Sequence, residues 1–309
     1  MRVRFGHAVA AVCVLAVGAC ASASSKPTSA GLKSTTTVRP RVVDHRPFGF
    51  TVRHEVFVDT TRPTATPGNA AYSATRVLPT DLYVPEAMTP RPLIMFSHGY
   101  HGAPAKFSQL FGAWARAGYI VAAPQFPLTS TRGAPYDIVS DYVDQPADIS
   151  FVLTQLLHGP LRSQIDATRI AAAGLSLGGA TTYGLVYDPC CVDARLRSAA
   201  IFDGVRLPFS QPFGRNTIPV LIAHIDTDLA APYAVAKQAF VGSASPKWLL
   251  TFHTGIHPEA YENTPSPHDH TAIQTSIDFF DLTLLGDNAA RGRLMRDGDN
   301  RGESTIVAG

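Results

Sequence analysis

The chain has 309 residues, of which 45% are hydrophobic and 16% are charged. Its 26 basic and 24 acidic residues leave a formal net charge of +2, a balance that gives no reason to expect nucleic acid or an acidic partner. This length and apolar content are sufficient for one large domain with a substantial buried core.

The N-terminus has the pattern of a targeting segment. Arg2 and Arg4 precede a short apolar run from Ala8 to Val17. Because about ten residues cannot cross a bilayer that needs about 20, this run fits the core of a secretory signal and not a membrane span.

The end of this segment, Val17-Gly18-Ala19-Cys20, resembles the lipobox of bacterial lipoproteins. The resemblance implies that residues 1–19 are removed and that Cys20 is acylated, which would anchor an exported protein to a membrane of the cell envelope. An ordinary signal peptide, cut near Ala21 or Ala23, is the alternative.

The anchor is followed by a stretch rich in Ser, Thr, Pro and Ala, and we expect residues 20–48 to form a flexible stalk. A folded domain is then expected over residues 49–309. The remaining cysteines, Cys190 and Cys191, are adjacent. They could form a strained disulfide ring in an oxidising compartment or stay as two thiols, and neither form indicates catalysis.

Strand and helix patterns alternate along this domain. Helical spacing is clearest where Phe107, Leu110, Phe111 and Trp114 fall on one face. The expected strands cover residues 51–59, 75–85, 92–97, 119–123, 169–175, 198–202, 219–223 and 248–252. The expected helices cover residues 106–117, 149–156, 177–187, 232–241 and 273–284. This alternation predicts an α/β protein with a mainly parallel sheet of about eight strands flanked by helices, its first two strands forming an antiparallel edge.

The sharpest motif is Gly174-Leu175-Ser176-Leu177-Gly178-Gly179, between an expected strand and an expected helix. A serine on such a tight turn projects its hydroxyl, and a Cβ atom at either flanking glycine would clash with the turn. We therefore predict that Ser176 is a nucleophile, which requires a histidine base and an acid that orients it.

Asp228 is the favoured acid. It lies nine residues after Pro219 and four before Pro232, a spacing similar to the seventh-strand segment of α/β-hydrolases. Asp226 is close enough to compete. Asp203 is a second alternative, since relatives such as the platelet-activating-factor acetylhydrolases take their acid from the preceding strand.

His257 is the favoured base, because it follows the expected strand 248–252 and a short glycine-containing turn. His268 and His270, just before the last helix, are alternatives. An oxyanion would receive a backbone N–H group from Leu177, which follows the nucleophile. The segment Ser97-His98-Gly99-Tyr100 is similar to the one that follows the third strand of α/β-hydrolases, and this resemblance implies that the Tyr100 N–H is the second donor.

Together these segments resemble the dienelactone-hydrolase and chlorophyllase-like branch of the α/β-hydrolases, a branch that includes bacterial polyester hydrolases. The resemblance covers about residues 75–285. It implies the α/β-hydrolase fold and a serine hydrolase that cleaves carboxylic esters through an acyl-enzyme. True dienelactone hydrolases have a catalytic cysteine, whereas position 176 is serine, which favours carboxylic esters.

This chemistry requires no cofactor and no metal, and its partners would be a small or polymeric ester and, through the lipid, a membrane. The oligomeric state is not readable. Two other functions remain open: a binding protein on a hydrolase scaffold, and a metal site. The ligands for a metal would come from one loop: His253, His257, Glu259, Glu262, His268, Asp269 and His270.

Overall fold

The computed structural model describes residues 47–65, 71–131, 138–208 and 215–309. The signal segment, Cys20 and all but the last two residues of the expected stalk lie outside these ranges. Within them, every helix is too short or too polar to cross a membrane.

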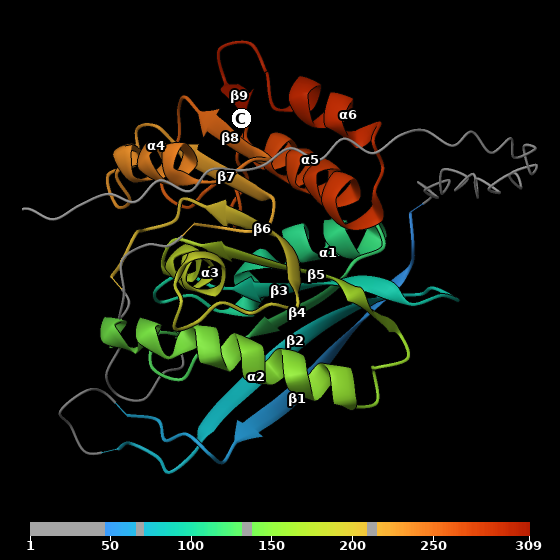
Figure 1. Cartoon of the computed structure of the whole chain (residues 1–309), viewed down its shortest axis with the longest axis vertical. Helices are drawn as coiled ribbons and strands as arrows, with labels where there is room; N and C mark the ends of the chain where they lie inside the picture. Colours follow the sequence, from blue (N-terminus) through green and yellow to red (C-terminus); the bar gives the residue numbers. More distant parts are fainter. Residues whose placement is uncertain (1–46, 66–70, 132–137, 209–214) are drawn as a thin grey trace, which may run out of the picture. The chain divides into compact units, whose positions relative to one another are not determined.

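A single sheet of nine strands forms the centre of the described structure, in the order β1-β2-β4-β3-β5-β6-β7-β8-β9 (Figure 1). The strands are β1 (Phe50–Asp59), β2 (Arg76–Pro85), β3 (Arg91–Ser97), β4 (Ile120–Pro124), β5 (Ile165–Leu175), β6 (Leu196–Phe202), β7 (Val220–Ile225), β8 (Lys247–Phe252) and β9 (Ser304–Ala308). The six strands from β4 to β8 in this order are parallel, whereas β1, β2 and β9 run antiparallel to their neighbours.

All eight expected strands are present, and the antiparallel edge formed by β1 and β2 is confirmed. The sequence analysis missed β9, which pairs with β8 and ends the sheet. Its five residues carry only Ile306 as a buried hydrophobic side chain, so the strand has little apolar pattern of its own.

Helices cover both faces of the sheet (Figure 1). The α-helices are α1 (Ser108–Arg116), α2 (Gln145–His158), α3 (Leu177–Tyr187), α4 (Tyr233–Gly242), α5 (Asp269–Phe280) and α6 (Ala290–Asp297). Three short helical segments adjoin these helices. The segment η1 (Pro104–Phe107) precedes α1, η2 (Val139–Val143) precedes α2, and η3 (Asp281–Leu285) continues α5. One face packs against α1 and α5, and the other packs against α2, α3 and α4.

Strand β5 illustrates why the sheet lies between two helical layers. Ala171 and Ala173 belong to the core on the α1 and α5 side, while Ile170 and Ala172 belong to the core on the α2 side. Burial on both faces accounts for the continuous apolar run expected of a central parallel strand. The small side chains let α3 pack closely above the strand that precedes it.

A buried group of charges joins β2 to the region around α2. The fully buried guanidinium of Arg76 donates to Asp141 at 2.9 Å and to Asp148 at 2.6 Å. Arg62 donates to the second oxygen of Asp148 at 2.7 Å. Both carboxylates therefore have cationic partners inside the protein, an arrangement that the sequence analysis did not find.

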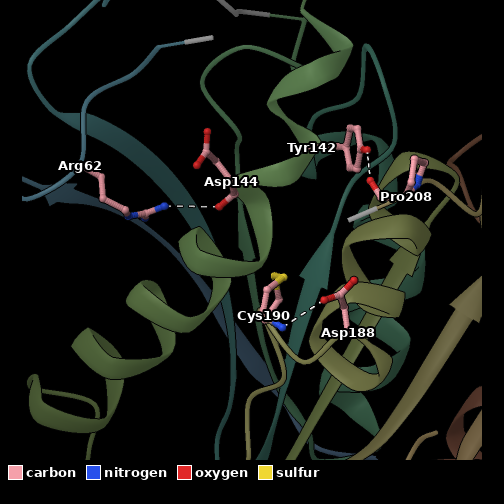
Figure 2. Close-up of a disulfide and its surroundings, with 7 residues drawn as sticks. Arg62, Tyr142, Asp144, Asp188, Cys190 and Pro208 are labelled. Atoms are coloured by element: carbon pink, nitrogen blue, oxygen red, sulfur yellow. Dashed lines mark hydrogen bonds between the residues drawn. A yellow bond between two sulfur atoms is a disulfide. The ribbon is translucent and has the colours of Figure 1, made fainter. Parts of the chain in front are cut away.

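Cys190 and Cys191 are joined by a disulfide in the turn after α3, so the structure contains the first of the two forms considered (Figure 2). Their Cα atoms are 3.8 Å apart, and the amide of Cys190 donates to the Asp188 carboxylate at 3.0 Å. This turn follows the C-terminal end of α3, whereas Ser176 precedes its N-terminal end.

Candidate active site

Ser176 occupies a tight turn between β5 and α3, with a φ of 57° and a ψ of −114°. Such backbone geometry is uncommon for a residue with a side chain and marks stored strain. A Cβ atom on Gly174 would lie 2.2 Å from the Gly178 carbonyl oxygen, and one on Gly178 would lie 1.9 Å from the Ser97 carbonyl oxygen. Neither position has room for a side chain, but only at Gly174 is the clash with the turn itself, as expected; at Gly178 it is with the end of β3.

The loop after β3 lies directly against this turn. A Cβ atom on Gly99 would come within 3.3 Å of the Ser176 Cβ atom and 3.8 Å of its hydroxyl oxygen. Tyr100, the next residue, is partly exposed, and Leu177 is the buried first residue of α3. Both residues expected to supply oxyanion N–H groups thus adjoin the segments that meet at Ser176.

His98 fixes the start of this loop. The Phe126 amide donates to His98 Nε2 at 3.0 Å, so Nε2 is the unprotonated nitrogen and Nδ1 donates to the Gly99 carbonyl oxygen at 2.7 Å. Burial lowers the pKa of His98 to about 4, which keeps the ring neutral. A neutral ring in one tautomer therefore links the Gly99 backbone to the loop after β4.

Further bonds connect the same two loops. The His101 amide donates to the Thr129 carbonyl oxygen at 2.9 Å, and the Thr131 amide donates to the Gly102 carbonyl oxygen at 3.1 Å. The buried Gln145 side chain donates to Thr129 Oγ1 at 2.7 Å and accepts from Thr181 of α3 at 2.5 Å. The loop beside Ser176 is therefore held from two sides.

Asp228 and His257, which are 29 residues apart in the chain, are hydrogen-bonded to each other. His257 Nδ1 lies 2.6 Å from Asp228 Oδ2. The other carboxylate oxygen, Oδ1, accepts from the amides of Ala230 at 2.7 Å and Ala231 at 3.0 Å. These three bonds fix the carboxylate after β7 and, through it, the orientation of the imidazole.

The electrostatics of this pair favour opposite charges. Burial alone would lower the pKa of His257, but the hydrogen bond to Asp228 and the charges of Asp203 and Asp228 raise it above its ordinary value. Burial alone would raise the pKa of Asp228, but His257 and the two backbone amides lower it. Asp228 therefore stays ionised next to an imidazole that binds a proton more readily than usual.

The competing histidines have other partners. His253 Nδ1 bonds to Asp226 at 2.8 Å, so these two residues form a separate pair. The buried His268 directs Nε2 to the Thr254 carbonyl oxygen at 2.8 Å. His270 is an exposed residue in the first turn of α5.

Asp203, the alternative acid, follows β6 and is fully buried. Its Oδ1 accepts from the Ile225 amide at 2.8 Å, and its backbone φ is 42°. One ligand-type atom from each of Asp203, Asp228 and His257 falls within 4.8 Å of the other two. Both candidate acids therefore adjoin the same imidazole, but the direct bond is to Asp228.

The expected set of metal ligands is not assembled in the described part of the chain. Of its seven members, only His257 belongs to a group of three close potential ligands, and its companions there are Asp203 and Asp228. A second close group in the described ranges, Asp188 with Cys190 and Cys191, contains the disulfide sulfurs.

A cavity of about 310 Å³ opens where β2 begins and β4 ends. The two strands are antiparallel, and the Gln125 amide donates to the Pro79 carbonyl oxygen at 2.7 Å. The cavity therefore lies at the end of the sheet where the parallel strands β3 and β5 also have their C-terminal ends. It is lined by uncharged side chains: Thr64, Tyr72, Ser73, Thr75, Val77, Pro79, Gln125, Phe126, Pro127, Leu128 and Ser130.

The fold is that of the α/β-hydrolases: a mostly parallel sheet with helices on both faces, and a serine turn between a central strand and the helix that follows. A family model described as Chlorophyllase matches residues 52–203, and this family belongs to the α/β-hydrolase superfamily. No curated protein matches the chain. The match runs from β1 through Asp203 and includes Ser176, but it ends before Asp228 and His257. It supports a hydrolase of the α/β-hydrolase type.

Proposed function

We propose that this protein is a serine esterase that hydrolyses carboxylic esters through an acyl-enzyme, with Ser176, His257 and Asp228 as its catalytic triad. The observation that carries the proposal is the 2.6 Å bond between His257 Nδ1 and Asp228, in a protein whose strained serine turn follows the central strand β5. The chlorophyllase match adds support for ester hydrolysis.

In this mechanism the bond to Asp228 keeps the Nδ1 proton in place, which leaves His257 Nε2 to accept the Ser176 proton. The Ser176 oxygen forms a bond to the ester carbonyl carbon, and the bond to the leaving alcohol breaks as His257 returns the proton to that alcohol. Water then attacks the acyl-enzyme, giving its proton to His257. The carboxylic acid is released when Ser176 regains a proton.

The negative charge on the carbonyl oxygen would be stabilised by the backbone N–H groups of Leu177 and Tyr100. Donors of this kind contribute about 3–4 kcal/mol each to transition-state stabilisation. The contacts of His98 and Gln145 support this assignment, because they fix the loop that carries Tyr100 and the neighbouring loop after β4.

Covalent labelling by a fluorophosphonate tests the proposal. The native protein should be labelled, and Ser176→Ala should not be. Ser108→Ala, which removes a hydroxyl from α1, is the matched control and should be labelled like the native protein. A native protein that resists the reagent would support a binding protein on a hydrolase scaffold.

A serine peptidase or an acyltransferase would use the same three side chains, so the substrate class rests on the surroundings. The uncharged, partly aromatic lining of the cavity beside β2 supports a neutral ester group as its occupant. Val77→Trp should raise KM for a bulky p-nitrophenyl ester by about 10-fold and leave p-nitrophenyl acetate nearly unchanged. Val56→Trp, on exposed β1, is the control. An unchanged KM of Val77→Trp for the bulky ester would remove the cavity from the substrate site.

The metal-binding alternative rests on the proximity of Asp203, Asp228 and His257. The bond between Asp228 and His257 favours the triad, because it engages an imidazole nitrogen and a carboxylate oxygen with each other. Elemental analysis of the purified protein and activity after EDTA treatment separate the two functions. A stoichiometric metal whose removal abolishes ester hydrolysis would contradict the triad.

We also propose that the protein is exported and anchored to a membrane through acylated Cys20. This proposal rests on the lipobox-like sequence that ends at Cys20.

A further inference from the structure

Asp203 is a buried carboxyl group of which only one oxygen has a structural partner in the described residues. It is completely buried at the end of β6, yet only Oδ1 has a hydrogen-bond partner among the described residues, the Ile225 amide. A buried carboxyl oxygen without a partner is costly, and its backbone φ of 42° is also unusual for aspartate. Strain and an unsatisfied polar atom at one residue are typical of a functional position.

The surroundings of Asp203 point to His257. An atom of its carboxyl group lies within 4.8 Å of both the His257 ring and the Asp228 carboxylate. Tyr261 stacks on Phe202, the residue before Asp203, at 4.6 Å between ring centroids, and its buried hydroxyl has no hydrogen-bond partner in the described ranges. The imidazole therefore has one carboxylate bonded to Nδ1 and a second carboxyl group close by.

We propose that Asp203 is a second acid for His257: it stabilises the imidazolium that forms during catalysis, and it supports the ring when Asp228 is missing. This inference rests on the proposed esterase mechanism and deepens it. Asp203 acts through His257, so it is a positioning residue that does not itself contact the ester.

The charged groups around Asp203 determine when it acts. Burial, together with the nearby carboxylates of Asp228 and Glu259, raises the pKa of Asp203 to about 7, while the Ile225 amide and His257 act in the opposite direction. Glu262 also raises the pKa of His257. The charge of each group therefore affects the protonation of the other, and Asp203 and His257 titrate as interacting sites.

The first test uses the pH dependence of kcat/KM for p-nitrophenyl acetate. Because the Asp203 charge raises the pKa of His257, Asp203→Asn should move the acidic limb to lower pH by about 0.5–1 unit. Asp226→Asn, which changes the carboxylate paired with His253, should leave the limb in place. If Asp203 had a purely structural role, Asp203→Asn would lower the activity without moving the acidic limb. An active Asp203→Asn with an unchanged acidic limb would therefore overturn the proposal.

The second test removes the first acid. Asp228→Ala, which leaves no amide to fix the wrong tautomer, should keep at least about 10-fold more activity than the double variant Asp203→Asn/Asp228→Ala. Equal activities would mean that Asp203 does not support the ring. Both proteins lack the Asp228 contacts to Ala230 and Ala231, so that loss cancels in the comparison.

A third test uses the native protein alone, so its outcome does not depend on whether a variant folds. The chemical shifts of the His257 ring protons, followed by NMR, should respond to the ionisation of Asp203 near pH 7 as well as to that of the ring itself, and so change in two steps. A single step would contradict the inference. This result is independent of the esterase mechanism, which fails separately if the fluorophosphonate does not label the native protein.

Discussion

Gly178 allows the serine turn to lie against β3, because its missing side chain leaves space for the Ser97 carbonyl group. A Cβ atom there would be 1.9 Å from a backbone oxygen, a distance that no side-chain rotation can relieve. We expect Gly178→Ala to lower kcat/KM at least 100-fold or to prevent folding, measured by ester hydrolysis and thermal unfolding.

Gly292 provides the matched control for that substitution. It lies in α6, and a Cβ atom would meet nothing within 4 Å. Gly292→Ala should therefore keep full activity and gain up to about 1 kcal/mol in free energy of unfolding, because alanine favours the helix. Equal effects of the two substitutions would show that the contact with Ser97 has no importance.

In the proposed mechanism, the acidic limb of the pH profile depends on His257. The ring must be neutral to accept the Ser176 proton, and its hydrogen bond to Asp228 raises its pKa above the ordinary 6.5. Activity should therefore fall as the pH decreases through an apparent pKa above 6.5. Asp228→Asn should move this limb to lower pH as well as reduce kcat, and a limb that stays in place would contradict the assigned acid.

The sequence predicted the parts of the site that follow strands, but not the contacts that hold them. Ser176, Asp228 and His257 each stand where a strand pattern ends, and the favoured acid and base are hydrogen-bonded in the structure. The alternatives could not be separated from spacing alone, because Asp203 also follows a strand and reaches the same imidazole. Only the three-dimensional arrangement distinguishes a bonded acid from a neighbouring one.

At the scale of elements, the largest feature absent from the sequence analysis is the Arg76 cluster. Asp141 and Asp148 are 65 and 72 residues from Arg76 in the chain, so no local sequence pattern connects them. Strand β9 was missed for a related reason. It is a strand because it pairs with β8, and its few apolar residues do not form a strand pattern in the sequence. The alternating helices and strands were predictable because the helices show apolar residues at helical spacing and the central strands are continuous apolar runs.

The Arg76 cluster should be essential for stability. Arg76→Met removes the cation that faces Asp141 and Asp148, leaving buried carboxylates with too few partners. Loss of one member of a buried ion pair costs about 3–5 kcal/mol, so we expect a decrease of that size in the free energy of unfolding, measured in urea.

Arg296 offers a comparison on the surface. It pairs with Asp297 at 3.0 Å, but its side chain is 67% exposed. Arg296→Ala should change the free energy of unfolding by less than about 1 kcal/mol. A small effect of Arg76→Met, similar to that of Arg296→Ala, would mean that the buried cluster is not needed to hold β2 against α2.

At the scale of the whole molecule, the catalytic proposal and the anchoring proposal concern separate parts of the chain. The proposed triad and oxyanion donors fall between Tyr100 and His257, whereas the proposed lipid attachment depends on Cys20. Anchoring and ester hydrolysis should therefore be separable. Cys20→Ser should move the protein from the membrane fraction to the soluble fraction and leave kcat/KM for p-nitrophenyl acetate within about twofold of the native value in detergent.

Two measurements distinguish this expectation from its alternative. Metabolic labelling with a radioactive fatty acid should mark the native protein and not Cys20→Ser, while Cys13→Ser, which changes a cysteine inside the apolar run, should still be labelled. Equal membrane association of the native protein and Cys20→Ser would indicate an ordinary signal peptide, in which Cys20 has no role. In both cysteine variants, the proposed labelling by the fluorophosphonate should match that of the native protein, so a failure of anchoring is not mistaken for a failure of folding.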